Sequence, residues 1–334
     1  MDFQLDETQQ EIAALAAGVL GRESDTPWKA LGEAGLLALA VPERLGGDGL
    51  GVLETAVLLT EVGRRAVDVP ALATLALGVL PIVAHGTVEQ QDALLPLVTE
   101  QHAVFTAALS EPSRPLPVSP ETRAGEDGIF GTKINVPNAG EAVRMLVSTD
   151  IGVFVVDPAQ PGVSTSDGVV RFEGARGEPL GGGEERAGAG ARPSTPADID
   201  LRRFALAGAC AVADGVLAGA LDLTVAHVGT RHQFGKPLAT FQSAAALVAD
   251  VYIASRTLHL AAVTAAWSLD DTDLDTAAYW LAAEALPAVH SCHHLHGGLG
   301  LDITYPMHRY YGMAKELTRF VGGVEHRLGA IDVR

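Results

Sequence analysis

Apolar residues recur at three- and four-residue spacing along the first hundred residues, which is the pattern of amphipathic helices. One such run extends from Glu11 to Leu20, and a second begins at Trp28 and leads to Gly35. A segment rich in Pro and Gly, residues 41–50, predicts a loop before a further helix at 53–63. We therefore expect an N-terminal helical domain over residues 1–102.

The pattern changes at about residue 103 to short β-branched runs between turns. Strands are predicted at 129–134, 145–148 and 153–156. Residues 181–196 contain a Gly-Gly-Gly run and two prolines, and they predict a loop or partly mobile linker. A middle β domain that includes this linker is expected over residues 103–197.

From residue 199 onward the chain is Ala-rich and again has helical spacing. Helices are predicted at 200–230, 238–269, 274–295 and 305–319, and small residues on facing helices would let their backbones approach closely. Long helices of this kind suit a four-helix bundle, which we place in a C-terminal domain at 198–334. The fold class expected for the whole chain is α+β, mostly α.

The stretch from Arg231 to Gln242 lies where the first of these predicted helices ends and the second begins. Gly235 and Pro237 are poor residues for a helix interior, so a tight break is predicted there. Arg231 and Gln233 supply donors at the break, and Phe234 is a candidate for an exposed ring. Because an Arg fork matches phosphate oxygens, an anionic ligand is one interpretation, and an ion pair with a nearby acid is the other.

A second stretch, residues 293–300, places three glycines after a helical run, where a ligand can approach the backbone closely. His293, His294 and His296 also suggest a metal site. The chain has no HExxH or CxxC pattern here, so we predict no metal.

Together the two stretches resemble motifs of the acyl-CoA dehydrogenase family, Arg-x-x-Phe-Gly with a later Gln, and Gln-x-x-Gly-Gly-x-Gly. The match continues through residues 304–306 and 309–311 to 314–315, and residues 41–49 resemble the family's Val-Pro-Glu turn. The resemblance covers nearly the whole chain. Within the family, the chain is similar to the short, non-catalytic subunit of bacterial heterotetrameric dehydrogenases that act on the cholesterol side chain and related steroids. It implies an N-terminal helical domain, a middle β domain and a C-terminal four-helix bundle.

In the family, the two motifs reach across a subunit interface and hold the adenine and pyrophosphate of the neighbour's FAD. The resemblance therefore implies cofactor contacts at seven positions. They are Arg231, Gln233, Phe234, Gln242, His294, Gly297 and Gly298. His294 stands where Gln is usual; a histidine can also donate to phosphate and adds a pH dependence.

The half-site for the subunit's own flavin ring departs from the family pattern. Residues 109–112 resemble the family's Thr-Glu-Pro, but residues 113–117 lack the Gly-Ser-Asp that follows, and two prolines there remove backbone donors. Asn135 and Pro137 occupy the positions of a Trp and a Thr that contact the flavin in relatives. We expect this half-site to be lost.

The family's catalytic base, a Glu, is also missing. Its two usual positions hold Val321 and Arg202, and neither side chain can accept a proton. Asp302, Glu316 and Glu325 are the candidate replacements, although acids on such a helix usually form a solvated face or pair with Lys and Arg. We expect no catalytic residue in this chain.

Composition narrows the function further. A formal net charge of −18 argues against a nucleic-acid partner. The acidic N-terminus lacks the order of a secretory signal, and no uninterrupted apolar run reaches membrane length. Cys210 and Cys292 are expected to be core residues rather than a disulfide framework. These features predict a cytoplasmic protein without a membrane partner.

The resulting hypothesis is a subunit of a heteromeric FAD-dependent acyl-CoA dehydrogenase. Its partner would be a catalytic subunit, the heterodimer pairing into a heterotetramer. The assembly would form an α,β-trans double bond in acyl-CoA, with steroid side-chain CoA esters as substrates and an electron-transfer flavoprotein or similar acceptor. Two alternatives stay open: a self-sufficient homo-oligomeric dehydrogenase with a relocated base, and a structural paralogue without flavin.

Overall fold

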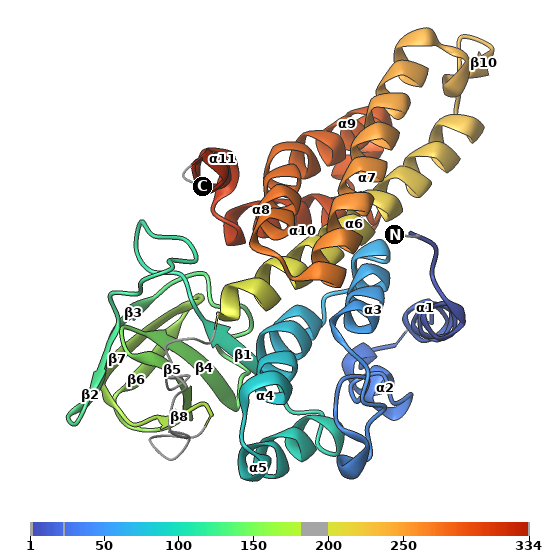
Figure 1. Cartoon of the computed structure of the whole chain (residues 1–334). Coiled ribbons are helices and arrows are strands. Elements are labelled where there is room, and N and C mark those ends of the chain that lie inside the picture. Colours follow the sequence, from blue (N-terminus) through green and yellow to red (C-terminus); the bar gives the residue numbers. More distant parts are fainter. Residues whose placement is uncertain (1–2, 23, 182–199, 333–334) are drawn as a thin grey trace. The chain divides into compact units, whose positions relative to one another are not determined.

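The computed structural model describes residues 3–22, 24–181 and 200–332 (Figure 1). The described chain divides into two compact units. The first comprises residues 1–25, 56–69 and 206–334, and the second comprises 26–55 and 70–205. The linker predicted at 181–196 lies, except for Gly181, outside the described residues. The division into three domains at 102 and 197 stays a prediction.

The predicted fold class is confirmed. Helices come first along the chain, two β-sheets follow, and helices return to the C-terminus (Figure 1). The N-terminal helices are α1 (Glu7–Leu20), α2 (Pro27–Glu33), α3 (Val52–Arg64), α4 (Leu80–His85) and α5 (Val88–Thr99). Capping boxes begin α1 at Asp6 and α5 at Thr87, each closed by a glutamine three residues later.

A π-helical segment, Leu72–Val79, precedes α4, and a second, Leu281–Ala285, lies between α8 and α9. Each is followed by a Leu-Pro pair, at Pro81 and Pro287. Proline has no N–H to donate and clashes with the carbonyl four residues earlier. The wider turn accommodates that clash without ending the helix.

The two four-stranded sheets belong to the second unit. Their strands are β1 (Phe105–Ala108), β2 (Arg123–Gly125), β3 (Gly128–Lys133), β4 (Arg144–Thr149), β5 (Gly152–Val156), β6 (Val163–Ser166), β7 (Val169–Ala175) and β8 (Glu178–Pro179). One sheet has the order β1-β4-β5-β8 with β1 parallel to β4; the other has the antiparallel order β2-β3-β7-β6. Side chains from both sheets, including Met145, Val147, Val170 and Phe172, form one core.

The C-terminal helices lie close to their predicted bounds. They are α6 (Leu201–Thr230), α7 (Gln242–Ser268), α8 (Asp271–Trp280), α9 (Leu286–His296), α10 (Met307–Phe320) and α11 (Gly323–Asp332). The helix predicted at 274–295 is α8 and α9 joined by the π-helical segment, and α11 was not predicted.

Glycines allow α3 and α6 to approach closely within the first unit. A Cβ built on Gly215 would lie 1.9 Å from the Thr60 carbonyl oxygen, and one on Gly63 would lie 2.1 Å from that of Val212. A Cβ on Gly219 would meet the Arg64 carbonyl at 2.0 Å. The small residues seen in the sequence therefore form a helix–helix contact that tolerates no methyl group.

Among the described residues, α6 and α7 are long and apolar enough to cross a membrane by length and composition alone. The most apolar window of α6 is 89% buried within the chain, which is the behaviour of a core helix. The corresponding window of α7 is only 28% buried. Much of the surface of α7 is thus apolar and uncovered by this chain.

Candidate functional site

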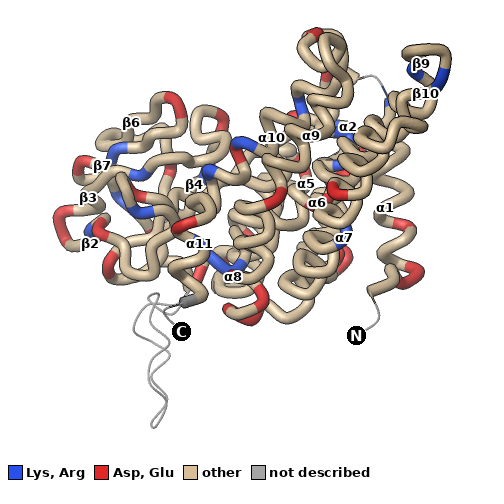
Figure 2. The backbone as a smooth tube through the Cα atoms, turned by 90° about the horizontal axis from the view of Figure 1, so that it is seen from above, with Lys and Arg blue, Asp and Glu red and all other residues tan. Residues whose placement is uncertain are grey.

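The predicted break between two helices is a two-residue β-hairpin. After α6 ends at Thr230, β9 (His232–Gln233) pairs with β10 (Lys236–Pro237). The turn residues Phe234 and Gly235 have φ of 52° and 80°, so both are left-handed, as in a type I′ turn. The hairpin carries Lys and Arg but no acid (Figure 2). A positive projection thus extends from an acidic chain.

Phe234 at the tip is unusual in two ways. Its ring is 92% exposed, and its left-handed backbone is unfavourable for a bulky side chain. The ring makes an edge contact with Phe241 at 6.2 Å between centroids, and Lys236 lies 4.3 Å from the Phe241 centroid. Backbone strain of this kind clusters at functional sites, so we interpret Phe234 as a ligand or partner contact.

The second motif follows α9. The helix ends at His296, and Gly297 adopts φ 56°. A Cβ built on Gly297 or Gly298 would meet no atom within 4 Å, and both residues are exposed. The backbone is therefore open to close approach by a ligand at this turn.

A histidine stack joins the two motifs within the first unit. His227 lies one helical turn before Arg231 on α6, and its ring stacks on that of His296 with centroids 4.5 Å apart and planes 24° apart. His296 directly precedes Gly297. Two stretches far apart in the sequence are thus held together at the ends of α6 and α9.

All seven predicted cofactor contacts lie on the solvent-exposed surface of the chain. They are Arg231, Gln233, Phe234, Gln242, His294, Gly297 and Gly298. Among the described residues, the Arg231 guanidinium makes no hydrogen bond or ion pair. An ion pair with another described residue therefore does not account for Arg231. A guanidinium without such a partner can bind an anion.

The three histidines near the glycines point to different partners. His296 packs on His227, His293 lies against Tyr311 at 5.8 Å, and His294 is exposed. Across the described residues, no group of three or more His, Cys, Asp or Glu side chains is arranged to hold a metal ion.

The two positions considered for a catalytic base have other environments. Val321 is fully buried, and its carbonyl accepts a hydrogen bond from Arg327 Nε at 2.5 Å. Within the second unit, Arg202 Nε donates to Asp200 Oδ1 at 2.8 Å. Neither position provides a proton acceptor.

The acids considered as replacements lack the surroundings of a general base. Asp302, Glu316 and Glu325 are all exposed. The backbone N–H and hydroxyl of Thr304 donate to Asp302 and lower the pKa of its carboxyl. A lowered pKa makes a carboxylate a weaker base, whereas catalysis near neutral pH favours a raised one.

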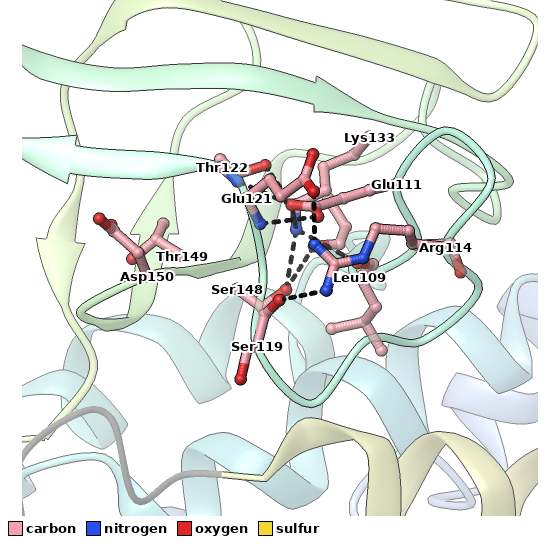
Figure 3. A network of polar contacts seen from close by, with 12 residues as sticks. Leu109, Glu111, Arg114, Ser119, Glu121, Thr122, Lys133, Ser148, Thr149 and Asp150 are labelled. Atoms are coloured by element: carbon pink, nitrogen blue, oxygen red, sulfur yellow. Dashed lines mark hydrogen bonds and ion pairs between the residues drawn. The ribbon is translucent and has the colours of Figure 1, made fainter. Parts of the chain in front are cut away.

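The segment predicted to depart from the flavin-binding pattern is closed on itself in the second unit (Figure 3). We call residues 110–122 the Glu111 loop. The Glu111 carboxylate accepts hydrogen bonds from the N–H of Glu121 at 2.7 Å and from the N–H and hydroxyl of Thr122 at 2.8 and 2.7 Å. It also pairs with Lys133 at 2.9 Å. One side chain thus fastens both ends of the loop.

Glu111 and Lys133 form a buried ion pair, at 3% and 0% side-chain exposure. Burial opposes ionisation of Glu111, but the surrounding donors outweigh it and lower its pKa to about 2. Burial likewise lowers the pKa of Lys133 to about 8, although Glu111 opposes the change. Lys133 also donates to the Leu109 carbonyl and the Ser148 hydroxyl. Both groups are charged at pH 7, and their polar atoms are satisfied within the loop's surroundings.

One side chain in the middle of the Glu111 loop, that of Leu116, is packed inward. Leu116 is 3% exposed, and its N–H donates to the Ser110 hydroxyl at 3.2 Å. Arg114 pairs with Glu121 at 2.7 Å. At the other departures, Asn135 adopts φ 52° in a turn, and the Pro137 carbonyl accepts from the Thr106 hydroxyl. These residues therefore have structural roles within the chain.

Comparison with known proteins defines the class. The acyl-CoA dehydrogenase N-terminal domain family matches residues 6–102, and the C-terminal domain family matches residues 196–331. The chain therefore belongs to the acyl-CoA dehydrogenase family. It is similar to acyl-CoA dehydrogenase FadE28 of Mycobacterium tuberculosis, with 46% identity over 100% of this chain and 99% of the relative.

Two solved structures share the fold along nearly their whole length. A variant of the Tcur3481–Tcur3483 steroid ACAD superposes with a TM-score of 0.86 at 32% identity, covering 98% of this chain and 97% of that one. The ChsE4–ChsE5 complex of M. tuberculosis also has a TM-score of 0.86, at 28% identity over 100% and 98% of the two chains.

Sequence reasoning missed the His227–His296 stack and the Glu111–Lys133 pair. His227 lies four residues before Arg231 and His296 directly before Gly297, so both flank predicted motifs. Their proximity depends on how α6 packs on α9, which no local pattern records. The one signal in the sequence was that each of the two histidines lies within four residues of a predicted motif.

Proposed function

We propose that this chain is the non-catalytic subunit of a heteromeric FAD-dependent acyl-CoA dehydrogenase. It offers contacts for the adenine and pyrophosphate of a flavin held mainly by a catalytic partner subunit. The observation that carries the proposal is the contrast between two parts of the chain. The Arg231 hairpin and the Gly297 turn are open and joined by a histidine stack, whereas the Glu111 loop is closed by its own hydrogen bonds.

The exposed groups fit the phosphate end of a dinucleotide. The guanidinium of Arg231 is unpaired among residues 3–22, 24–181 and 200–332. The open backbone at Gly297 and Gly298 allows close approach of a pyrophosphate. The side chains of Gln233, Gln242 and His294 add exposed donors. When bound, FAD supplies the hydride acceptor, and this chain's residues would hold it in place.

The partner would supply the base and the acyl-CoA site. Formation of an α,β-trans double bond in a thioester requires a carboxylate that removes the α-proton. Val321 is buried and apolar, and Arg202 is paired with Asp200. The exposed Asp302, Glu316 and Glu325 lack the burial that would tune a base. These observations favour a base on the partner over a relocated one.

Exposed apolar surface supports a protein partner. Ile253, Leu260 and Trp267 recur every seven residues on α7 and are 62%, 40% and 64% exposed. Leu301 and Ile303, beyond the Gly297 turn, are 77% and 76% exposed. Such a stripe calls for a covering helix. A heterodimer that pairs into a heterotetramer would cover it, and the ChsE4–ChsE5 complex is a relative that forms a complex.

The substrate and location follow from the relatives and the chain. Because the Tcur3481–Tcur3483 protein is a steroid ACAD, we propose steroid side-chain CoA esters, as in cholesterol catabolism, as the substrate class. An electron-transfer flavoprotein or similar acceptor would reoxidise the flavin. Cys210 and Cys292 are both free thiols and buried, which suits the reducing cytoplasm.

The test is flavin binding by the purified complex. We expect this chain to be colourless alone and to form a yellow complex, with one flavin per heterodimer, when co-expressed with a catalytic subunit. Arg231→Ala should weaken flavin binding about 10- to 100-fold because a charge-assisted hydrogen bond is lost. Arg171→Ala, which removes an exposed arginine on β7, is the matched control and should bind flavin normally.

Two outcomes would support the alternatives. A yellow homo-oligomer that reduces an artificial acceptor would establish a self-sufficient enzyme with a relocated base. A complex whose flavin affinity is unchanged by Arg231→Ala would indicate a structural paralogue that makes no cofactor contact.

A further inference from the structure

His296 is a buried polar group with an unused nitrogen. The residue is 5% exposed, and its Nδ1 lies 2.8 Å from the Cys292 carbonyl, so Nδ1 carries the proton that donates there. Its Nε2 is buried and has no hydrogen-bond partner among the described residues. A buried nitrogen without a partner is costly and calls for a reason.

Protonation would give Nε2 a role. In the neutral ring Nε2 carries a lone pair, and no donor in the described parts of the chain bonds to it. The Leu223 carbonyl on α6 acts on this ring in the direction that favours the charged form. A protonated His296 could therefore donate to the Cys292 carbonyl on α9 and toward the Leu223 carbonyl on α6.

Burial and neighbouring positive charge both favour the neutral form of the two stacked histidines in the free chain. Burial lowers the pKa of His227, and Arg231, the residue directly after α6, lowers it further. Burial also lowers the pKa of His296, with contributions from His227 and from His293 on α9. Tyr305, after the Gly297 turn, packs against His296 with centroids 5.3 Å apart. No carboxylate acts on either histidine among the described residues.

We propose that His227 and His296 are positioning residues that hold the two halves of the anion site together and take up a proton when a phosphate-bearing dinucleotide binds. The inference rests on the proposed function, because the ligand is the phosphate end of the partner's flavin. The inference adds that ligand affinity depends on pH through the His227–His296 stack, which would not itself touch the ligand.

The sign follows from electrostatics. A bound pyrophosphate offsets the charge of Arg231, which is the group that lowers the pKa of His227, and it adds negative charge near the stack. Binding therefore raises the pKa of the stack. By linkage the ligand must bind more tightly as the pH falls, by up to about tenfold per pH unit while one proton is taken up.

The first measurement needs no ligand. In the full chain, histidine ring resonances are followed by NMR as the pH is changed, and His227→Phe assigns the signals. We expect Arg231→Ala to raise the pKa of His227, whereas His232→Gln, on the exposed hairpin, should leave it unchanged. An unchanged pKa of His227 in the Arg231→Ala variant would overturn the coupling on which the inference depends.

The second measurement is the flavin dissociation constant of the complex at pH 8 and pH 6. His294→Gln is the common background, since it removes the exposed histidine of the proposed site. We expect the dissociation constant to fall about threefold to tenfold at the lower pH. The double variant His227→Phe, His296→Phe keeps two stacking rings but cannot titrate, so it should match the background at pH 8 and lose the gain at pH 6.

The outcomes separate the two claims. If Arg231→Ala leaves flavin affinity unchanged, the proposed function fails and the inference fails with it. If Arg231→Ala weakens binding but the double variant His227→Phe, His296→Phe keeps the full pH dependence, the proposed function stands and only the inference fails. His227→Ala, which removes the ring, should weaken binding at both pH values because the two halves of the site are no longer joined.

Discussion

The Glu111 loop and the Arg231 hairpin are both chain reversals that carry charged residues. They differ in whether the charged side chains have partners within the chain. In the loop, Glu111 accepts from two backbone N–H groups, a hydroxyl and a lysine, and Leu116 is packed inward. At the hairpin, the Arg231 guanidinium has no hydrogen-bond or ion-pair partner in the described part of the chain, and Phe234 is 92% exposed. A charge that is satisfied internally serves the fold, whereas one left open at a strained turn is available for another molecule.

The contrast also bears on how a subunit can lose one function and keep another. Taking two charges out of water is costly unless every polar atom is satisfied, and Glu111 and Lys133 meet that condition. The two N–H groups and the hydroxyl that Glu111 engages are therefore not available to a ligand. The hairpin has kept its donors, so the comparison predicts structural effects at one region and binding effects at the other.

The largest expected effect is at the buried pair. Lys133→Met leaves the Glu111 carboxylate buried without its cation, and we expect a loss of about 3–5 kcal/mol in the free energy of unfolding. Urea unfolding of variant and wild type measures it. The double variant Glu111→Gln, Lys133→Met removes both charges and should recover part of the loss. A single variant as stable as wild type would contradict the interpretation of the loop as a locked structural element.

The same pair predicts an acid limit. The pKa of Glu111 is lowered to about 2 from its usual 4.5, so the stabilisation is present above pH 4.5 and is lost as the pH falls toward 2. Over that range Glu111 should account for roughly 3 kcal/mol of unfolding free energy. Stability measured from pH 6 to pH 3 should therefore fall less steeply in Glu111→Gln than in the wild type.

The next effect tests the helix that carries the hairpin. Gly215→Ala places a methyl 1.9 Å from the Thr60 carbonyl oxygen, so α3 and α6 must separate, at a cost of about 1–3 kcal/mol. Gly312→Ala is the control, because a Cβ on this residue of α10 meets no atom within 4 Å. The control should be neutral or slightly stabilising, since alanine favours helix over glycine. Equal effects of the two substitutions on the urea midpoint would argue against the close contact.

Much of the fold was predictable because the helices are long and their ends carry strong signals. The bounds of α6 were predicted to within a residue, and Gly235 with Pro237 marked the break that became the hairpin. Short strands such as β2 and β6 were missed because three or four residues carry little periodicity. The parallel pairing of β1 with β4 depends on contacts between distant segments, which local patterns do not record.

The candidate site likewise has features that local residue types predict and features that depend on distant segments. Arg231, Phe234 and the Gly297 turn were identified from residue types that need special backbone or bind phosphate, and the structure places all of them at the surface. For the Glu111 loop, the sequence showed that the family's Gly-Ser-Asp is missing. It did not show that the loop is closed by its own hydrogen bonds. That closure depends on Lys133, whose ammonium reaches the loop only because β3 is paired within its sheet. Long-range partners of this kind require the tertiary structure.

The smallest effect is at the hairpin tip, where stability and binding should change in opposite directions. Asparagine tolerates the left-handed conformation that Phe234 adopts, so Phe234→Asn should leave the free chain unchanged or stabilise it by up to about 1 kcal/mol. Gly235→Ala is the counterpart, because alanine is strained at φ 80° although space is open around it, and it should destabilise the turn by about 1 kcal/mol. Thermal unfolding of the free chain measures both. The flavin affinity of the complex should fall in Phe234→Asn despite the relaxed backbone, because the exposed ring is lost. A Phe234→Asn chain that is less stable than wild type would mean that the ring serves the fold, and the hairpin would then resemble the Glu111 loop rather than differ from it.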